Sequence, residues 1–172
     1  MPKLLQITDI HLNGDYNGKF DVKGHFEKIL ADNRNIDYDA VVLTGDLADD
    51  GSIDDYVMIF TRIMDTFGFS IPILVTPGNH DNRENLQRAY EEYLAAHREF
   101  KNKAVICQRD TFMNPGASIV VLDIIDAVGT TYHLISMDTG HKDIPYEGVE
   151  NLVKMSFFIS DVNCLFTHMP LI

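Results

Sequence analysis

Cysteine is scarce in this sequence of 172 residues, which contains only Cys107 and Cys164. So few cysteines exclude a disulfide-stapled scaffold, and their separation is not that of a thiolate metal site. Both lie in apolar, strand-like runs, so we expect them to be buried free thiols of a cytoplasmic protein. Any metal site in this chain is therefore expected to use oxygen and nitrogen ligands.

Basic residues are also few, because 14 lysines and arginines stand against 26 aspartates and glutamates and give a formal net charge of -12. Proteins that follow a nucleic-acid backbone rely on contacts from lysine and arginine to phosphate. Nucleic acid is therefore not an expected partner. A small phosphoester remains compatible with this charge, because bound divalent cations reverse the sign of the local field.

Long apolar runs are absent, and none approaches the length of a helix that spans a bilayer, so no membrane partner is expected. Residues 1–3 lead at once into a strand, without the charged and apolar regions of a signal peptide. The apolar content of 45% is ordinary for a folded protein. We therefore expect a single domain over residues 1–172, located in the cytoplasm.

The first half of the chain alternates short apolar runs with stretches of helical periodicity. The apolar runs, which indicate strands, are residues 4–7, 40–43 and 71–75. The helices that follow them are predicted to begin after Asp21, after Ser52 and at about Glu84. Gly68 is expected to end the second helix and Phe100 the third. This alternation predicts a parallel sheet.

The second half of the chain is richer in strand patterns. Strands are predicted at residues 104–107, 118–125, 131–137 and 163–166, with a hairpin connection at 126–130 and a helix at 147–158. These strands predict a second sheet that packs on the first. The expected fold class is therefore an α/β sandwich with helices on the outside.

Polar side chains follow the predicted parallel strands at the points where the strands end. The segments concerned are Thr8-Asp9-Ile10-His11, Thr44-Gly45-Asp46, Thr76-Pro77-Gly78-Asn79-His80-Asp81 and, after the last predicted strand, Thr167-His168. Because open α/β sheets bind ligands beyond the carboxyl ends of their strands, we expect one site at one edge. Asp9 and His11 are two residues apart and should face the same side of an extended strand.

These side chains offer carboxylate, amide and imidazole ligands, which suit two metal ions such as manganese (Mn²⁺), iron (Fe²⁺ or Fe³⁺) or zinc (Zn²⁺). Asp46 has two oxygens with which to bridge two ions. Ions about 3.5–4 Å apart can hold an attacking hydroxide between them and stabilise a phosphoryl group. His80 is placed to protonate the leaving oxygen. Asp81 is expected to orient the ring of His80.

The motif order resembles that of the calcineurin-like metallophosphoesterases. The blocks that carry the resemblance, in order, are Asp9-x-His11, Gly45-Asp46-x-x-Asp49-Asp50-Gly51, Gly78-Asn79-His80-Asp81 and His168 near a proline. The second and third blocks are most similar to those of bacterial class III cyclic-nucleotide phosphodiesterases. The resemblance spans nearly the whole chain and implies a four-layer α-β-β-α sandwich.

The resemblance also implies a role for each site residue. Asp9 and His11 resemble ligands of the first metal, and Asp46 resembles the carboxylate that bridges both metals. Asn79 and His168 resemble ligands of the second metal. By the same resemblance, His80 contacts the phosphate and assists the leaving group.

One block of the family pattern is absent. The family has a Gly-His-x-His block after the last histidine, with one ligand for each metal, and none follows His168. The segment Gly140-His141-Lys142-Asp143 has a similar spelling but precedes His168, and we interpret it as a turn. We therefore expect a C-terminally incomplete domain, in which an oligomer or a missing C-terminal segment completes the metal site.

Other polar residues have structural interpretations. His25 and His97 lie on predicted helices, and His133 lies in a predicted strand. The acidic pairs Asp49–Asp50 and Asp54–Asp55 are interpreted as solvated loop and helix-start residues.

The leading hypothesis is a metal-dependent phosphoesterase that hydrolyses a small phosphodiester, above all a 3′,5′-cyclic nucleotide. One alternative is a phosphomonoesterase, protein phosphatase or nuclease of the same superfamily, because a fold and a metal site do not choose a substrate. The other alternative is a catalytically weakened binding module.

Overall fold

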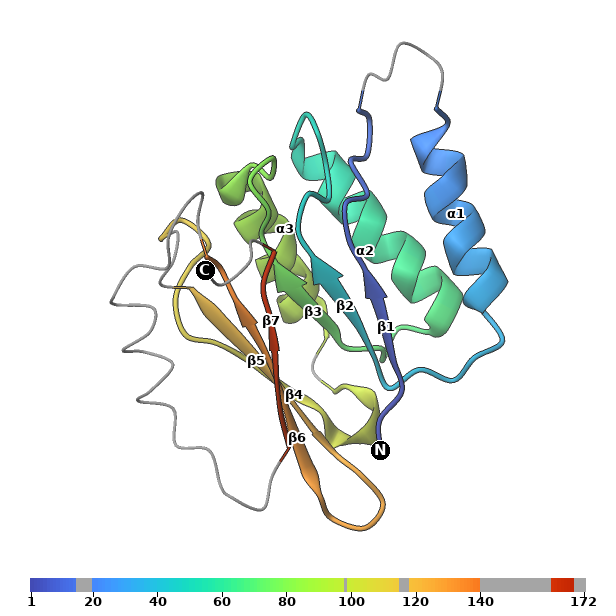
Figure 1. Cartoon of the computed structure of the whole chain (residues 1–172), viewed down its shortest axis with the longest axis vertical. Coiled ribbons are helices and arrows are strands. Elements are labelled where there is room, and N and C mark those ends of the chain that lie inside the picture. The colour runs from blue at the N-terminus through green and yellow to red at the C-terminus, as the bar shows by residue number, and fades with distance from the viewer. Residues whose placement is uncertain (15–19, 98, 115–117, 140–161, 169–172) are drawn as a thin grey trace.

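The first β-sheet of the protein is parallel and has the strand order β1-β2-β3 (Figure 1). A computed structural model describes residues 1–14, 20–97, 99–114, 118–139 and 162–168. The three strands are β1 (Leu4–Ile7), β2 (Ala40–Thr44) and β3 (Ile73–Thr76). Every residue of β2 and β3 is buried, which explains their continuous apolar character. The predicted parallel sheet is confirmed.

Three α-helices cover one face of this sheet (Figure 1). They are α1 (Val22–Asn33), α2 (Ile53–Phe67) and α3 (Arg83–Ala96). The Asp21 side chain accepts a hydrogen bond from the backbone N–H of Gly24, and the Ser52 hydroxyl accepts one from Asp55, so both predicted N-caps are confirmed. Gly68 ends α2 with φ 99°, as expected.

The second sheet packs against the opposite face of the first and has the order β4-β5-β6-β7 (Figure 1). Its strands are β4 (Val105–Gln108), β5 (Ile119–Ile125), β6 (Thr131–Met137) and β7 (Val162–Phe166), and a short 3-10 helix, η1 (Lys101–Lys103), precedes them. Neighbours are antiparallel except for β6 and β7, which are parallel. Asp126 and Thr130 close the predicted hairpin with a backbone hydrogen bond of 3.0 Å.

A continuous apolar core joins the helices to both sheets, and residues from the two sheets belong to one cluster of buried side chains. Val120, Leu122 and Leu134 of the second sheet are part of that cluster. A polar contact also joins the layers near the end of β3. There the hydroxyl of Ser136 donates to the carbonyl of Val75 at 2.7 Å and lies 2.6 Å from the hydroxyl of Thr76. The predicted α/β sandwich is therefore confirmed, with helix, sheet and sheet layers among the described residues.

Two local predictions are wrong. Helix α3 ends at Ala96 and not at Phe100, because His97 takes an extended conformation with φ -115° and ψ 99°. The cysteines are not both buried, because Cys164 is half-buried and Cys107 is exposed on β4, an edge strand whose side chains alternate between the core and the outside. The predicted helix at 147–158 and the predicted turn at 140–143 lie outside the described residues. Within the described ranges, none of the helices is long and apolar enough to cross a bilayer.

Candidate metal centre

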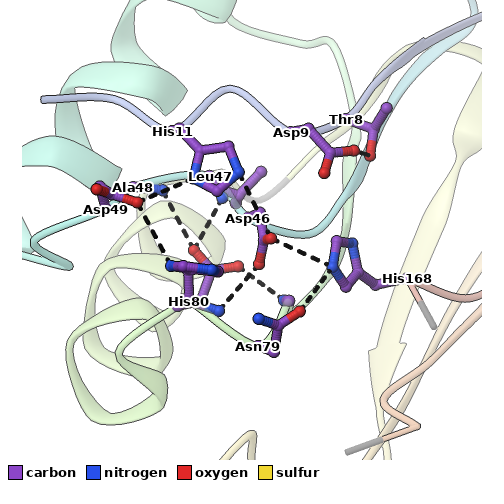
Figure 2. Close-up of polar contacts among 12 residues, drawn as sticks. Thr8, Asp9, His11, Asp46, Leu47, Ala48, Asp49, Asn79, His80 and His168 are labelled. Carbon is purple, nitrogen blue, oxygen red and sulfur yellow. Dashed lines mark hydrogen bonds and ion pairs between the residues drawn. The ribbon is translucent and has the colours of Figure 1, made fainter. Parts of the chain in front are cut away.

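The segments that follow β1, β2, β3 and β7 meet at one edge of the sandwich, and their polar side chains point toward one another (Figure 2). Backbone pairing continues past the strand ends and holds the first two segments together. The N–H of Asp9 donates to the carbonyl of Gly45 at 3.1 Å, and the N–H of His11 donates to that of Asp46 at 2.9 Å. The predicted single site at the carboxyl ends of the strands is therefore present.

The backbone at three of the predicted ligands is left-handed. The φ angles are 53° at Asp9, 47° at His11 and 51° at Asp46. Residues other than glycine seldom adopt this conformation, and such residues concentrate at functional sites. Strand β1 ends at Ile7, so the argument that Asp9 and His11 share one face of a strand is wrong. They approach the same site through backbone turns.

Two glycines allow the segments to approach this closely. A Cβ atom on Gly45 would lie 2.5 Å from the imidazole ring of His168, and Gly45 has φ 84°. A Cβ atom on Gly78 would lie 2.2 Å from both the backbone nitrogen and the carboxylate Oδ1 of Asp46. Glycine is therefore required at each position for the placement of a neighbouring side chain that is predicted to bind metal.

Replacing Gly78 by alanine should displace Asp46 and weaken metal binding by more than about tenfold. The free energy of unfolding should also fall by about 1–3 kcal/mol, the usual cost of overpacking a buried site. Isothermal titration with Mn²⁺ would measure the metal affinity, and a urea unfolding curve would measure the stability. Gly129→Ala is the control for metal affinity, because nothing lies within 4 Å of its Cβ position; its φ of 90° strains the backbone of this variant but displaces no side chain. Equal metal affinity in the Gly78→Ala and Gly129→Ala proteins would contradict the proposed packing.

The carboxylate of Asp46 lies at the centre of the site and is nearly buried (Figure 2). Its Oδ1 accepts a hydrogen bond of 2.9 Å from the backbone N–H of His80. Its Oδ2 lies 3.6 Å from Nε2 of His11 and 3.4 Å from Nε2 of His168. One oxygen therefore fixes the orientation of the side chain, and the other lies between two imidazole nitrogens.

The imidazole of His168 is held in one orientation by the end of β2. Its Nδ1 lies 2.9 Å from the backbone carbonyl of Thr44, which can only accept a hydrogen bond, so Nδ1 carries the proton. In the neutral ring Nε2 then has a lone pair. This lone pair points toward two further acceptors, Oδ1 of Asn79 at 3.2 Å and Oδ2 of Asp46.

The imidazole of His11 is also held through its Nδ1, in this case by the carboxylate of Asp49. Oδ1 of Asp49 lies 2.9 Å from Nδ1 of His11 and 3.4 Å from Nδ1 of His80. A carboxylate that accepts from one ring nitrogen leaves the other nitrogen to bind a metal. Asp49 is therefore not a solvated loop acid, as the sequence indicated, but a partner of two site histidines. The only feature of the sequence that could have indicated this role of Asp49 is its position three residues after Asp46.

The acidic residues near the start of α2 also differ from the prediction. Asp55 is buried, and its Oδ1 accepts a hydrogen bond from the side-chain amide of Asn13. Asn13 continues the left-handed segment that contains Asp9 and His11, with φ 63°. Asp55 therefore fixes the chain just beyond His11 and is not a solvated residue.

Two groups of side chains among the described residues could each hold a metal ion. They are Asp9 with Asp46 and His168, and His11 with Asp49 and His80. In each group, one ligand atom per residue lies within 4.8 Å of the others. Asp9 also accepts a hydrogen bond from the hydroxyl of Thr8, which restricts its rotation.

The chemistry of these atoms fits bound cations. Ligands about 2.0–2.2 Å from one ion lie roughly 3–3.5 Å apart. The distances among His168, Asn79 and Asp46 are 3.2 and 3.4 Å. Lone pairs and carboxylate oxygens that face one another repel unless a cation lies between them. The oxygen and nitrogen donors suit divalent transition metals.

The structure corrects the expected role of Asp81. Its buried carboxylate does not orient His80 but accepts from the backbone N–H groups of Gly78 at 2.8 Å, Leu47 at 2.9 Å and Ala48 at 3.3 Å. The hydroxyl of Tyr56 donates to the same carboxylate at 3.2 Å. Burial raises the pKa of Asp81, and the backbone hydrogen bonds oppose that rise. Asp81 thus ties the segment after β2 to the segment after β3.

Replacing Asp81 by asparagine should lower stability by about 1–3 kcal/mol, because the NH2 of the amide would face the backbone N–H of Gly78, which would then lack an acceptor. Metal affinity should fall about 10–100-fold, as it does when a residue that supports a ligand is lost. Urea unfolding and metal titration measure these effects. Tyr56→Phe is the milder comparison, since it removes one donor to Asp81 and leaves the three backbone N–H donors. A loss for Asp81→Asn no larger than that for Tyr56→Phe would contradict this role.

Known proteins are similar in sequence to part of this chain. A probable cyclic nucleotide phosphodiesterase from Fibrobacter succinogenes is 35% identical over 91 residues, which are 52% of this chain and 34% of that protein. A probable glycerophosphodiester phosphodiesterase from Arcobacter nitrofigilis is 36% identical over 98 residues, covering 52% of this chain and 34% of that protein. A 3′,5′-cyclic adenosine monophosphate phosphodiesterase from Haemophilus influenzae is 36% identical over 84 residues, which are 46% of this chain and 30% of that protein.

The match therefore spans about a third of the length of these curated relatives. Among solved structures, a dimetal phosphatase from Danio rerio is similar with a TM-score of 0.42 and 11% identity, covering 89% of this chain and 51% of that chain. The family model described as calcineurin-like phosphoesterase matches residues 2–171. The resemblance seen in the sequence motifs is therefore confirmed, and the chain belongs to the calcineurin-like phosphoesterase family.

Proposed function

We propose that this chain is a metal-dependent phosphodiesterase that hydrolyses a 3′,5′-cyclic nucleotide with the help of two divalent metal ions. The observation that carries the proposal is the position of Asp46 Oδ2, which lies 3.6 Å from Nε2 of His11 and 3.4 Å from Nε2 of His168. Such an oxygen can be shared by two ions, each of which also has one of these imidazole ligands.

The proposed ligand sets follow the resemblance to the metallophosphoesterases. Asp9 and His11 would hold the first ion, and Asn79 and His168 would hold the second. In space Asp9 lies with Asp46 and His168, and His11 lies with Asp49 and His80. Asp46 would serve both ions, and its Oδ1 also accepts a hydrogen bond from the N–H of His80. When bound, the ions supply positive charge for the phosphoryl oxygens and lower the pKa of a bound water.

His80 is proposed to act on the substrate and not on a metal. Its side chain is 50% exposed, whereas those of Asp46 and His168 are at most 10% exposed, so His80 lies at the open side of the site. Oδ1 of Asp49 lies 3.4 Å from Nδ1 of His80, which leaves Nε2 for the phosphoester. From this position Nε2 donates a proton to the leaving oxygen.

Two features support a small phosphodiester as the substrate. The names of the Fibrobacter succinogenes and Haemophilus influenzae relatives both specify cyclic nucleotide phosphodiesterases. The net charge of -12 opposes an extended nucleic-acid surface, which is the feature a nuclease needs beside its site.

An assay of the purified protein with Mn²⁺ against four substrates tests the proposal. Cyclic AMP and bis(p-nitrophenyl) phosphate should be hydrolysed, with p-nitrophenyl phosphate and single-stranded DNA hydrolysed much more slowly. Preference for p-nitrophenyl phosphate would favour a phosphomonoesterase, and preference for DNA would favour a nuclease. Metal binding without hydrolysis of any substrate would favour a binding module and would overturn the proposal.

A further inference from the structure

A cavity of about 330 Å³ lies between the end of β1 and the first half of α1. Its inner wall includes Ile7, Ile10 and Phe26, all of which are buried in the core. Ligand cavities in proteins start at about this volume and are lined mainly by apolar and aromatic side chains. The cavity therefore has the size and lining of a site for a small organic group.

The position of the cavity connects it to the metal centre. Asp9 and His11 line the cavity, and the same two residues belong to the two groups that could hold metal ions. A phosphoester bound at the centre has an organic substituent within a few bonds of phosphorus. The cavity is therefore placed to receive the substituent that extends from the site on the side of α1.

The outer rim of the cavity carries two aromatic rings. Phe20 and His25 stack with their ring centroids 5.4 Å apart and an interplanar angle of 30°. Stacked rings beside an apolar wall favour a flat aromatic group.

We propose that this cavity binds the aromatic, nucleobase-sized part of the phosphoester and so selects aromatic esters over small polyol esters. The inference rests on the function proposed above, because it assumes that a phosphoester binds at the metal centre. It adds the specificity-determining residues Phe20, His25 and Ile29, which no family motif in this sequence includes. His25 is then a ligand-facing residue and not only a helix residue, as its place in the sequence suggested.

Two phosphonates test the proposal directly, because phenylphosphonate and methylphosphonate share a headgroup and differ only in the substituent. Calorimetric titration of the Mn²⁺-loaded protein should show about tenfold tighter binding of phenylphosphonate, from burial and stacking of the ring. Phe20→Ala should reduce the ratio of the affinities for phenylphosphonate and methylphosphonate to about threefold or less. Ile29→Trp narrows the cavity and should reduce this ratio further. Both positions are largely exposed, so folding is retained, and circular dichroism checks this.

Lys28→Ala is the matched control, because Lys28 lies on α1, is exposed and does not line the cavity. This variant should keep the ratio of the unmodified protein. Equal binding of the two phosphonates by the unmodified protein, or an unchanged ratio in both cavity variants, would overturn the inference. Hydrolysis of bis(p-nitrophenyl) phosphate, measured alongside, separates this result from failure of the proposed function, since the reaction needs the metal centre whether or not the cavity is used.

Discussion

Replacing Asp46 by asparagine is expected to abolish phosphodiester hydrolysis and to weaken the binding of both metal ions. The reason is that Oδ2 of Asp46 is the oxygen placed between His11 and His168, at 3.6 and 3.4 Å from their Nε2 atoms. Loss of a residue that only supports a ligand costs about 10–100-fold in metal affinity, so loss of the shared ligand should cost more. The rate should fall at least about 1,000-fold, because bound ions contribute several kcal/mol to the stabilisation of the transition state.

Metal content by mass spectrometry and hydrolysis of bis(p-nitrophenyl) phosphate measure the two effects. Asp50→Asn is the matched control, since it removes the same charge from an exposed residue of the same segment. That control should keep both ions and nearly full activity. An Asp46→Asn protein with normal metal content would show that this carboxylate does not bridge the ions.

Replacing His80 by alanine should lower kcat by about 100- to 10,000-fold, the usual contribution of a general acid, without loss of metal. The side chain is 50% exposed at the open side of the site, and its Nδ1 contacts Asp49, so its removal leaves every proposed ligand in place. The loss should be smaller for a p-nitrophenyl ester than for an alkyl ester, because a good leaving group needs less protonation.

Comparison of the two kinds of ester in the unmodified and His80→Ala proteins distinguishes the roles of this histidine. Equal losses for both esters would remove the general-acid role and leave only stabilisation of charge on the phosphate. Loss of metal from the His80→Ala protein would instead make His80 a ligand, as its grouping with His11 and Asp49 would allow.

The sequence predicted the sheets well because β1, β2 and β3 are short, mostly apolar runs followed by polar residues. The same pattern predicted that Asp9, Asp46 and Asn79 meet at one edge. Backbone conformation was harder to predict, because the residue types in Asp9-Ile10-His11 do not indicate left-handed φ angles. That conformation depends on pairing with Asp46 and Gly45, which lie far away in the sequence.

The supporting residues of the site could not be assigned from sequence for a related reason. Asp81 follows His80 directly, so an interaction between the two was the natural expectation. In the folded chain, Asp81 instead faces Gly78, Leu47 and Ala48, and Asp49 takes its place beside His80. Which carboxylate faces which imidazole depends on the turn at Gly78 and on burial, and neither can be read from spacing alone.

Removal and return of metal tests the central claim most directly. The protein is stripped with a chelator and then titrated with Mn²⁺, while bound metal and the rate of bis(p-nitrophenyl) phosphate hydrolysis are measured on the same samples. Activity should vanish without metal and return as metal binds, reaching its maximum at about two ions per chain. Full activity in the metal-free protein, or a maximum rate reached without metal bound to His11 and His168, would contradict this account.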